Sequence, residues 1–332
     1  MLRHAFVVFA LVLFAVGSFA QSGTPERHFR FHYAFTVRNT HVGEPIRIWF
    51  PLAHSGEFQA VKIVSQTGDL PLRRARESEY RNAMLYAEDL RGAKAEYNFA
   101  VVYDVVRRQS TAYRESLSAE QLRLALSADR LVPITGLPAS IAARQVEGIR
   151  KEPARARALY NYALANMRYD HVGTGWGHGD TLYACSAKHG NCTDFHSLFI
   201  SMARSQNIPA RFEIGFSIPA EARSGEVAGY HCWAEFQNEN HEWVPVDISE
   251  AWKHPQQREF FFGHWDDDRV QFTVGRDLTL SPRQAGPPLN YFVYPYVELG
   301  GKDYANVSLH FSFEDLGDGA TKRGGDLRST MR

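Results

Sequence analysis

The feature that most constrains the fold is a change in hydrophobic periodicity near Leu117. Between His28 and Tyr113, apolar and polar residues mostly alternate, in segments separated by Gly, Asn, Ser and charged residues. Such alternation is typical of antiparallel strands with one buried face. The predicted strands cover His28–Val37, Pro45–Leu52, Ala60–Gln66 and Ala95–Gln109. We therefore expect an N-terminal β-sandwich-like unit, with a structural or substrate-positioning role, followed by a unit of a different type.

Beyond Leu117, apolar residues recur at helical spacing. The predicted helical segments are Leu117–Leu126, Pro138–Val146 and Glu152–Met167. Another helix follows Cys192, because apolar residues stand at positions 195, 198, 199 and 202. Strands are expected within Asn207–Pro219 and Gly229–Ser249 and in further pieces beyond Pro255. This second unit is therefore predicted to be α+β.

The first 20 residues have the pattern of a cleavable signal peptide. Arg3 supplies a positive charge, the apolar run Ala5–Val16 is too short to span a membrane, and Ser18 to Ala20 form a small-x-small cleavage site. An uncleaved anchor is the alternative. We expect a periplasmic or secreted protein with no later membrane span. The predicted divisions are a signal peptide at 1–20, a β domain at 21–115, a catalytic domain with a C-terminal β extension at 116–315, and a disordered tail at 316–332.

The charge balance restricts the kind of binding partner, and the cysteine count restricts the possible disulfides. The chain has 37 basic and 37 acidic residues, and removing Arg3 with the signal peptide leaves 36 against 37. This balance argues against nucleic acid or an anionic membrane as a partner. The chain has three cysteines, an odd number, so at least one thiol is unpaired within the chain even in an oxidising compartment.

Cys192 stands where a thiol is easily ionised. Asn191 is a good helix N-cap, Gly190 permits a sharp turn before it, and Asp194 favours the first helical turn. A thiol at a helix N-terminus, near an imidazolium, has its pKa lowered from ~8.5 into roughly the 3.5–7.5 range. A small buried cysteine and half of a disulfide remain alternatives at this point.

A histidine and an aspartate are predicted to lie opposite each other on neighbouring strands. If the hairpin is symmetric about Glu239, His231 pairs with Asp247, and directly opposed side chains share a face. Asp247 then accepts one imidazole N–H and leaves the other nitrogen free to face a thiol. A register slip of one residue destroys this pairing. Together with Cys192, the three groups fit the nucleophile, base and orienter of covalent acyl transfer.

The same residues carry a family resemblance. The segments GNCTDFHSLFISMARSQNIPARFEIGF, GYHCWAEF and WVPVDIS resemble the three core motifs of the transglutaminase-like superfamily. The resemblance covers roughly Ala156 to Ala251. It implies an α+β, papain-like core with Cys192 as nucleophile, His231 as base and Asp247 as orienter, and a structural role for Asp194. We expect a protein or peptide substrate and no cofactor. The segment 268–298 also resembles exported bacterial members of this group.

Some positions depart from the family's pattern or extend it. Cys232 stands where members commonly have Ala, and strand alternation predicts that it points away from the catalytic face and serves packing. A Cys185–Cys232 disulfide would leave Cys192 free, whereas a Cys185–Cys192 disulfide would inactivate it. The Cys192 backbone N–H is a natural oxyanion donor. Trp176 resembles in placement a tryptophan that supplies a second donor in some members, and its alternative role is packing over the cleft.

Other functions are less favoured. The histidines lack the spacing of a metal motif, so no metal site is expected. The acidic run Trp265–Val270 lacks the spacing of a calcium loop and is interpreted as a solvated turn. The Gly-rich segment Gly173–Asp180 lacks the lysine of a phosphate-binding loop. The leading hypothesis is an exported thiol enzyme acting on peptide or carboxamide bonds, with hydrolysis slightly favoured over crosslinking. The alternative is a non-catalytic envelope-organising protein that uses the same cleft.

Overall fold

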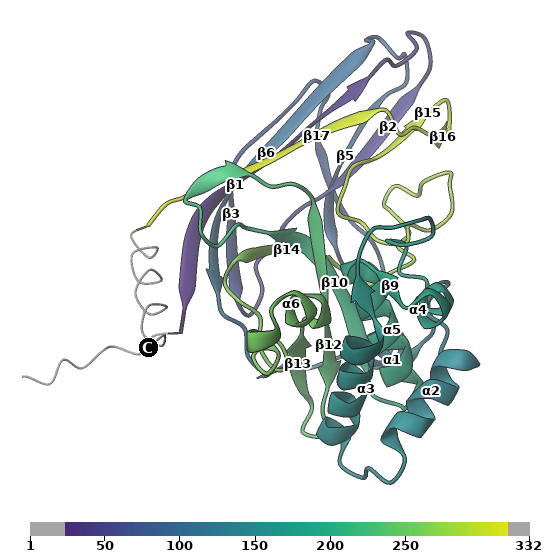
Figure 1. Cartoon of the computed structure of the whole chain (residues 1–332). Helices are drawn as coiled ribbons and strands as arrows, with labels where there is room; N and C mark the ends of the chain where they lie inside the picture. Colours follow the sequence, from purple (N-terminus) through teal and green to yellow (C-terminus); the bar gives the residue numbers. More distant parts are fainter. Residues whose placement is uncertain (1–23, 318–332) are drawn as a thin grey trace, which may run out of the picture.

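The computed structural model describes residues 24–317. The predicted signal peptide at 1–20 and almost all of the predicted tail at 316–332 lie outside the described residues. Within residues 24–317, no helix is long and apolar enough to cross a membrane. The described chain forms three five-stranded antiparallel sheets and a layer of helices (Figure 1).

The strands are grouped here by sheet, in spatial order. The first sheet contains β11 (Ser224–Glu226), β17 (Val307–Asp315), β1 (Glu26–Arg38), β6 (Glu96–Arg108) and β3 (Gln59–Gly68). The second contains β16 (Lys302–Asp303), β15 (Tyr296–Leu299), β2 (Ile46–Pro51), β5 (Ala83–Asp89) and β4 (Arg73–Arg76). The third, called here the core sheet, contains β14 (Arg269–Val274), β10 (Ala210–Ser217), β12 (Tyr230–Gln237), β13 (Glu242–Val246) and β7 (Tyr113–Arg114). A short parallel pair joins β8 (Arg168–Tyr169) to β9 (His189–Gly190).

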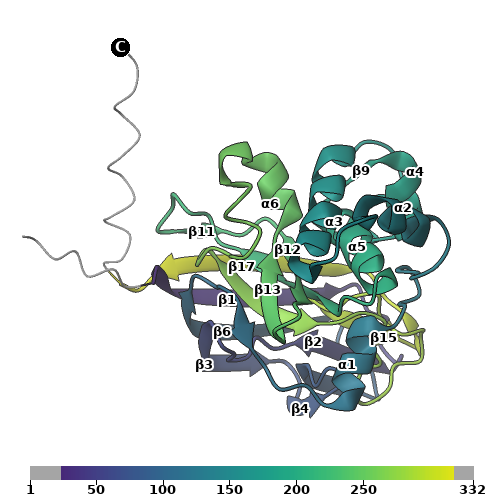
Figure 2. The same cartoon turned by 90° about the horizontal axis from the view of Figure 1, so that it is seen from below.

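Most of the helices lie against one side of the core sheet. The helices are α1 (Ala119–Leu126), α2 (Leu137–Val146), α3 (Glu152–Asn166), α4 (Thr181–Ala187), α5 (Cys192–Ser205), α6 (Ile248–Lys253) and the short 3₁₀ helix η1 (Pro255–Gln257). Helix α5 packs on β10 and β12 and is surrounded by α2, α3 and α4 (Figures 1 and 2). Every residue from Cys192 to Arg204 is buried, so α5 is the central helix of the fold.

The alternation seen in the sequence of β1 is confirmed as a buried aromatic face. Alternate residues from Phe29 to Val37 are buried and the residues between them are partly exposed. The Tyr33 ring lies 6.5 Å from Phe50 of β2 and 6.2 Å from Phe216 of β10. Burying each large apolar side chain stabilises a fold by about 1.5–3 kcal/mol. This aromatic cluster therefore joins both N-terminal sheets to the core sheet.

The end of the described chain returns to its beginning. Strand β17 pairs with β1 from Phe29↔Asp315 to Val37↔Val307, and β15 pairs with β2. Figure 1 shows β17, β15 and β16, in yellow, beside the purple and blue N-terminal strands. Residues 296–315, which the sequence places in an extension of the catalytic domain, thus complete the two sheets of the N-terminal residues.

Candidate active site

Local capping places Cys192 at the first position of α5. Asn191 is the N-cap; its side chain accepts a hydrogen bond from the Thr193 N–H at 2.9 Å, and Asp194 accepts one from the Asn191 N–H at 3.0 Å. Gly190 has φ +154°, and a Cβ there would lie 2.2 Å from Asp194 Oδ2. Only glycine fits this approach. Gly190, Asn191 and Asp194 therefore determine together where the helix begins.

Asp194 ties the helix start to the Gly-rich segment upstream. Its carboxylate accepts hydrogen bonds from the Gly177 N–H at 2.7 Å and the Gly179 N–H at 3.0 Å, in addition to that of Asn191. Burial raises its pKa, and these three backbone donors oppose that rise. Asp194 is thus positioned to hold the backbone on both sides of Cys192.

The predicted strand register is wrong, although the predicted contact is present. In β12 and β13, Ala234 pairs with Val246 and Gln237 with Trp243, so the hairpin is symmetric about Asn240 rather than Glu239. The ladder stops at Ala234, and Asp247 caps α6 instead of continuing β13. A shift of two positions preserves the side-chain face, and the turn into α6 brings Asp247 back to His231.

Asp247 holds His231 through a short hydrogen bond. His231 Nε2 lies 2.7 Å from Asp247 Oδ2, and Arg269 Nη1 donates to the same oxygen at 3.1 Å. Asp247 Oδ1 accepts from the Glu250 N–H. Burial would raise the pKa of Asp247, but the two cations hold it well below its usual range. Burial would lower the pKa of His231, whereas the charge and hydrogen bond of Asp247 raise it to about 10.

His231 contacts Cys192 through its remaining nitrogen. Nε2 is bound to Asp247, so the hydrogen bond between the imidazole and the Cys192 thiol uses Nδ1. The thiol is only 2% exposed. Burial alone would raise its pKa, but hydrogen bonds from Cys232 and His231 and the charge of His231 lower it well below the ordinary value. The arrangement therefore stabilises a thiolate–imidazolium pair.

Cys232 is not where strand alternation placed it. The prediction that it points away from the site is wrong, because its thiol hydrogen-bonds Cys192 and lies 3.8 Å from Thr193 Oγ1. Helix α5 covers the face of β12 that carries Cys232. His231 contacts the Cys192 thiol from the edge of β12 that has no partner strand beyond the end of β13.

None of the three cysteines forms a disulfide. Burial raises the pKa of the Cys185 thiol to about 11.

His196, one turn after Cys192, is a site residue that the sequence did not single out. Its Nδ1 lies 2.8 Å from the Cys192 carbonyl oxygen, and its Nε2 accepts a hydrogen bond from the Ile248 N–H at 3.0 Å. An acceptor at Nε2 requires the proton on Nδ1, so the ring is neutral; burial lowers its pKa. His196 therefore joins the start of α5 to the residue after Asp247. Its i+4 spacing from Cys192 indicates that the two residues share one face of the helix, so the sequence alone could have identified it.

The acidic run near residue 266 is also part of the site. The prediction of a solvated turn is wrong: Arg269 is 1% exposed and Asp267 is 2% exposed. Arg269 binds Asp266 at 2.9 Å as well as Asp247, and its guanidinium lies 4.8 Å from the centre of the Trp233 ring. No spacing rule in the sequence connects Arg269 to Asp247, since their contact depends on β14 lying beside β10.

Trp176 lies in the Gly-rich segment with its indole N–H already engaged. Nε1 donates to the Gly173 carbonyl at 3.1 Å, and the ring stacks on His171 with centroids 4.4 Å apart. The Cys192 N–H, by contrast, has no acceptor among residues 24–317, as expected for the first turn of a helix. Within the same residues, no group of three or more His, Cys, Asp or Glu is arranged to hold a metal ion.

Known proteins resemble this chain in structure or in sequence. The crystal structure of a candidate cysteine protease from Cytophaga hutchinsonii has a TM-score of 0.59 and 14% identity, covering 89% of this chain and 92% of that one. The periplasmic domain of TgpA from Pseudomonas aeruginosa has a TM-score of 0.38 and 16% identity, covering 71% of this chain and 91% of that one. An uncharacterized protein of Haemophilus influenzae (strain Rd) is 26% identical over 301 residues, 76% of this chain and 80% of the relative.

The Cytophaga likeness is one of fold, and it confirms the α+β class predicted from the sequence, with a cysteine-bearing helix packed on an antiparallel sheet behind an N-terminal β unit. Residues 139–248, which include Cys192, His231 and Asp247, match the transglutaminase-like superfamily. This chain therefore carries, at residues 139–248, a core domain of the transglutaminase-like superfamily.

Proposed function

We propose that this chain is an exported cysteine-nucleophile acyl-transfer enzyme that acts on peptide or carboxamide bonds. The observation that carries the proposal is the hydrogen-bonded series Cys192–His231–Asp247, in which a thiol at a helix N-terminus contacts an imidazole held 2.7 Å from a buried carboxylate. A thiolate–imidazolium pair of this kind supplies both a nucleophile and a general acid. Export is supported by the signal-peptide pattern of residues 1–20.

The proposed reaction has two steps. The Cys192 thiolate attacks the substrate carbonyl carbon and forms a C–S bond, while the proton on His231 Nδ1 passes to the leaving nitrogen as the C–N bond breaks. A thioester remains on Cys192. His231 Nδ1 then accepts a proton from water, the resulting hydroxide attacks the thioester, and the C–S bond breaks to release a carboxylic acid. Asp247 keeps the imidazole oriented and stabilises its charge throughout.

Water is the favoured acyl acceptor, because the Cytophaga relative in fold is described as a protease. An amine that attacks the same thioester would instead form a new amide bond. The first oxyanion donor is the unoccupied Cys192 N–H. Trp176 remains the proposed second donor, and this role requires its indole to leave the Gly173 carbonyl.

Trapping of the acyl-enzyme tests the proposal. The full chain is incubated with a library of peptides and γ-carboxamides, and mass spectrometry locates covalent adducts. A thioester on Cys192 with release of free acid supports hydrolysis, and an amine-resolved product supports crosslinking. Cys192→Ala should abolish turnover, while Cys185→Ala, at a half-buried thiol on α4, should retain it. Full turnover by Cys192→Ala would contradict the proposal.

A further inference from the structure

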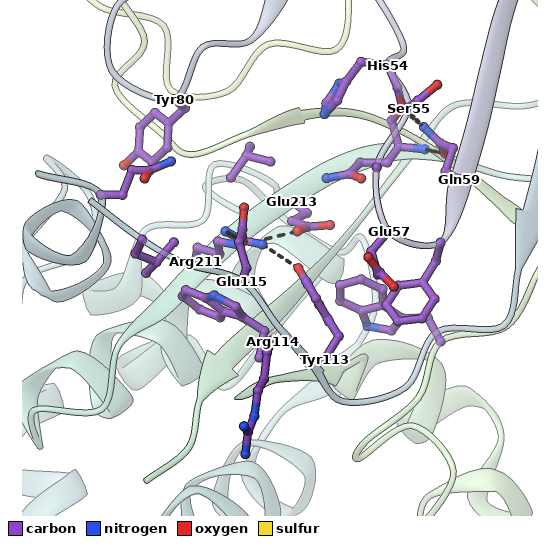
Figure 3. Close-up of a pocket in the computed structure, with 18 of the residues that line it drawn as sticks. His54, Ser55, Glu57, Gln59, Tyr80, Tyr113, Arg114, Glu115, Arg211 and Glu213 are labelled. Carbon is purple, nitrogen blue, oxygen red and sulfur yellow. Dashed lines mark hydrogen bonds and ion pairs between the residues drawn. The ribbon is translucent and has the colours of Figure 1, made fainter. Parts of the chain in front are cut away.

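A cavity separate from the candidate active site lies on the opposite side of the core sheet from α5. Its volume is about 380 Å³, within the range of pockets that hold small ligands. Its walls come from the segment after β2, the end of β6, β7 and the core strands β10 and β13. Figure 3 shows His54 and Tyr80 on one side of it, with Arg211 and Tyr113 on the other. Cys192, His231 and Asp247 do not line it.

The unsatisfied polar atoms in the cavity wall are mainly hydrogen-bond donors. Arg107 Nε, Trp243 Nε1 and Trp265 Nε1 are buried and have no partner among residues 24–317. A buried donor without an acceptor destabilises the fold. All three residues line one cavity, which favours an acceptor-rich group as its occupant.

Arg107 is the cation available for a ligand. It is 2% exposed and donates to Ser110 Oγ, and within residues 24–317 the nearest carboxylates that act on it, Glu213 and Asp266, do so beyond ion-pair distance. Arg211, a partly buried cation of the same wall, is already bound by Glu115 and Glu235. Burial, reinforced by the charge of Arg269, lowers the pKa of Arg107 to about 10, so it remains charged at neutral pH. Its guanidinium lies 6.0 Å from the centre of the Trp265 ring.

The surroundings restrict the charge and shape of the ligand. Glu115 and Glu213 line the same cavity, and they disfavour a dianion such as a phosphate by like-charge repulsion. The remaining wall includes the rings of Phe58, Tyr113 and Trp243, which suit a flat apolar body. We propose that this cavity binds a monocarboxylate with an aromatic or similarly flat body, whose carboxylate is held by Arg107 and the indole N–H of Trp265.

Paired probes of equal shape test this site. Benzoate and its neutral isostere benzamide are titrated into the full chain by calorimetry, with saturation-transfer NMR as a second readout. Benzoate should bind at least about tenfold more tightly, because hydrogen bonds to a charged acceptor are stronger than those to a neutral one. Equal affinities for the two probes, or no benzoate binding in the millimolar range, would overturn the proposal.

Matched arginine variants locate the binding. Arg107→Met should weaken benzoate binding about tenfold or more. Arg114→Met is the control, because the Arg114 side chain lines the cavity but is 74% exposed and already lies 3.7 Å from Glu242; its effect should stay within about twofold. If Arg107→Met fails to fold, Trp265→Phe removes one donor and keeps a ring, and should weaken benzoate about threefold. Unchanged benzoate affinity in the folded variant would overturn the assignment. Binding is measured without turnover, so the result is independent of the proposed catalysis.

Discussion

Arg269 and His231 share one carboxylate oxygen: Arg269 Nη1 lies 3.1 Å from Asp247 Oδ2, to which His231 Nε2 is bound at 2.7 Å. Arg269 also binds Asp266, which spreads its charge over two carboxylates. The imidazole is therefore not the sole cation that compensates the buried Asp247. Burial would lower the pKa of Arg269, but its acidic neighbours raise the pKa above its usual range. Arg269 therefore compensates the charge of Asp247 at every working pH.

Arg269→Met should destabilise the fold strongly. Removing one partner of a buried ion pair leaves an uncompensated charge and costs about 3–5 kcal/mol. Urea unfolding followed by circular dichroism measures the free energy of unfolding. Arg123→Met is the control, because Arg123 pairs with Glu120 on the exposed face of α1, and a surface pair contributes under about 1 kcal/mol. Similar losses in the two variants would refute the importance of the Arg269 contacts.

Cys192 should ionise far below an ordinary thiol. Its pKa is lowered, so the thiolate forms as pH rises through a low value; the His231 imidazolium is lost only above its pKa of about 10. The ion pair is therefore expected throughout the neutral range. At about pH 6, well below the ordinary thiol pKa of ~8.5, iodoacetamide should label Cys192.

Cys185 is the internal control for this experiment, because burial raises its pKa to about 11. Peptide mapping by mass spectrometry should find it unlabelled until the solution is strongly alkaline. Labelling of both thiols with the same pH dependence would mean that His231 does not stabilise the Cys192 thiolate.

Asp247→Asn should remove the charge of this side chain and keep its shape, which separates stabilisation of the imidazolium from orientation of the ring. Loss of the carboxylate lowers the pKa of His231 and raises that of Cys192, because each charged form loses its stabilising partner. Turnover should fall by about 10²–10⁴-fold. The ultraviolet absorbance of the thiolate, followed with pH, should shift to higher pH. Turnover loss without this shift would assign Asp247 to orientation alone.

His196 should act as a positioning residue. Its neutral ring joins the Cys192 carbonyl to the Ile248 N–H, so His196→Ala leaves two buried groups unpaired at about 1–3 kcal/mol each. Gln carries a donor and an acceptor, so His196→Gln should restore part of both stability and turnover. The pH of thiolate formation should move in His196→Ala because the Cys192 helix turn loosens. An unchanged pH profile would limit His196 to a structural role.

Local chemistry explains which parts of the site were predictable. Asn191, Asp194 and Gly190 determine the start of α5 by capping alone, and the sequence therefore placed Cys192 correctly. The His231–Asp247 contact survived a register error because a slip of two residues keeps the face. Both conclusions depend on residues close together in the chain or on one hairpin.

The parts that failed depend on tertiary packing. Alternation correctly separates His231 from Cys232, but it cannot show that β13 ends early and lets both reach one thiol. Arg269 looked like part of a solvated acidic turn, and only the pairing of β14 with β10 buries it beside Asp247. The pairing of β17 with β1 had no local signal either, because an alternating pattern predicts a strand but not the strand with which it pairs.

That return has a consequence for how the protein is made. Arg27 and Asp315, joined by a hydrogen bond of 2.9 Å, are separated by 288 positions in the chain. A ribosome therefore produces β1 long before β17, and the edge of β1 remains open through nearly all of synthesis. Open strand edges pair readily with other chains. Premature release of a chain that lacks its last described strands should thus yield aggregation rather than a stable fragment, since β17, the last strand within residues 24–317, is the one that pairs with the open edge of β1.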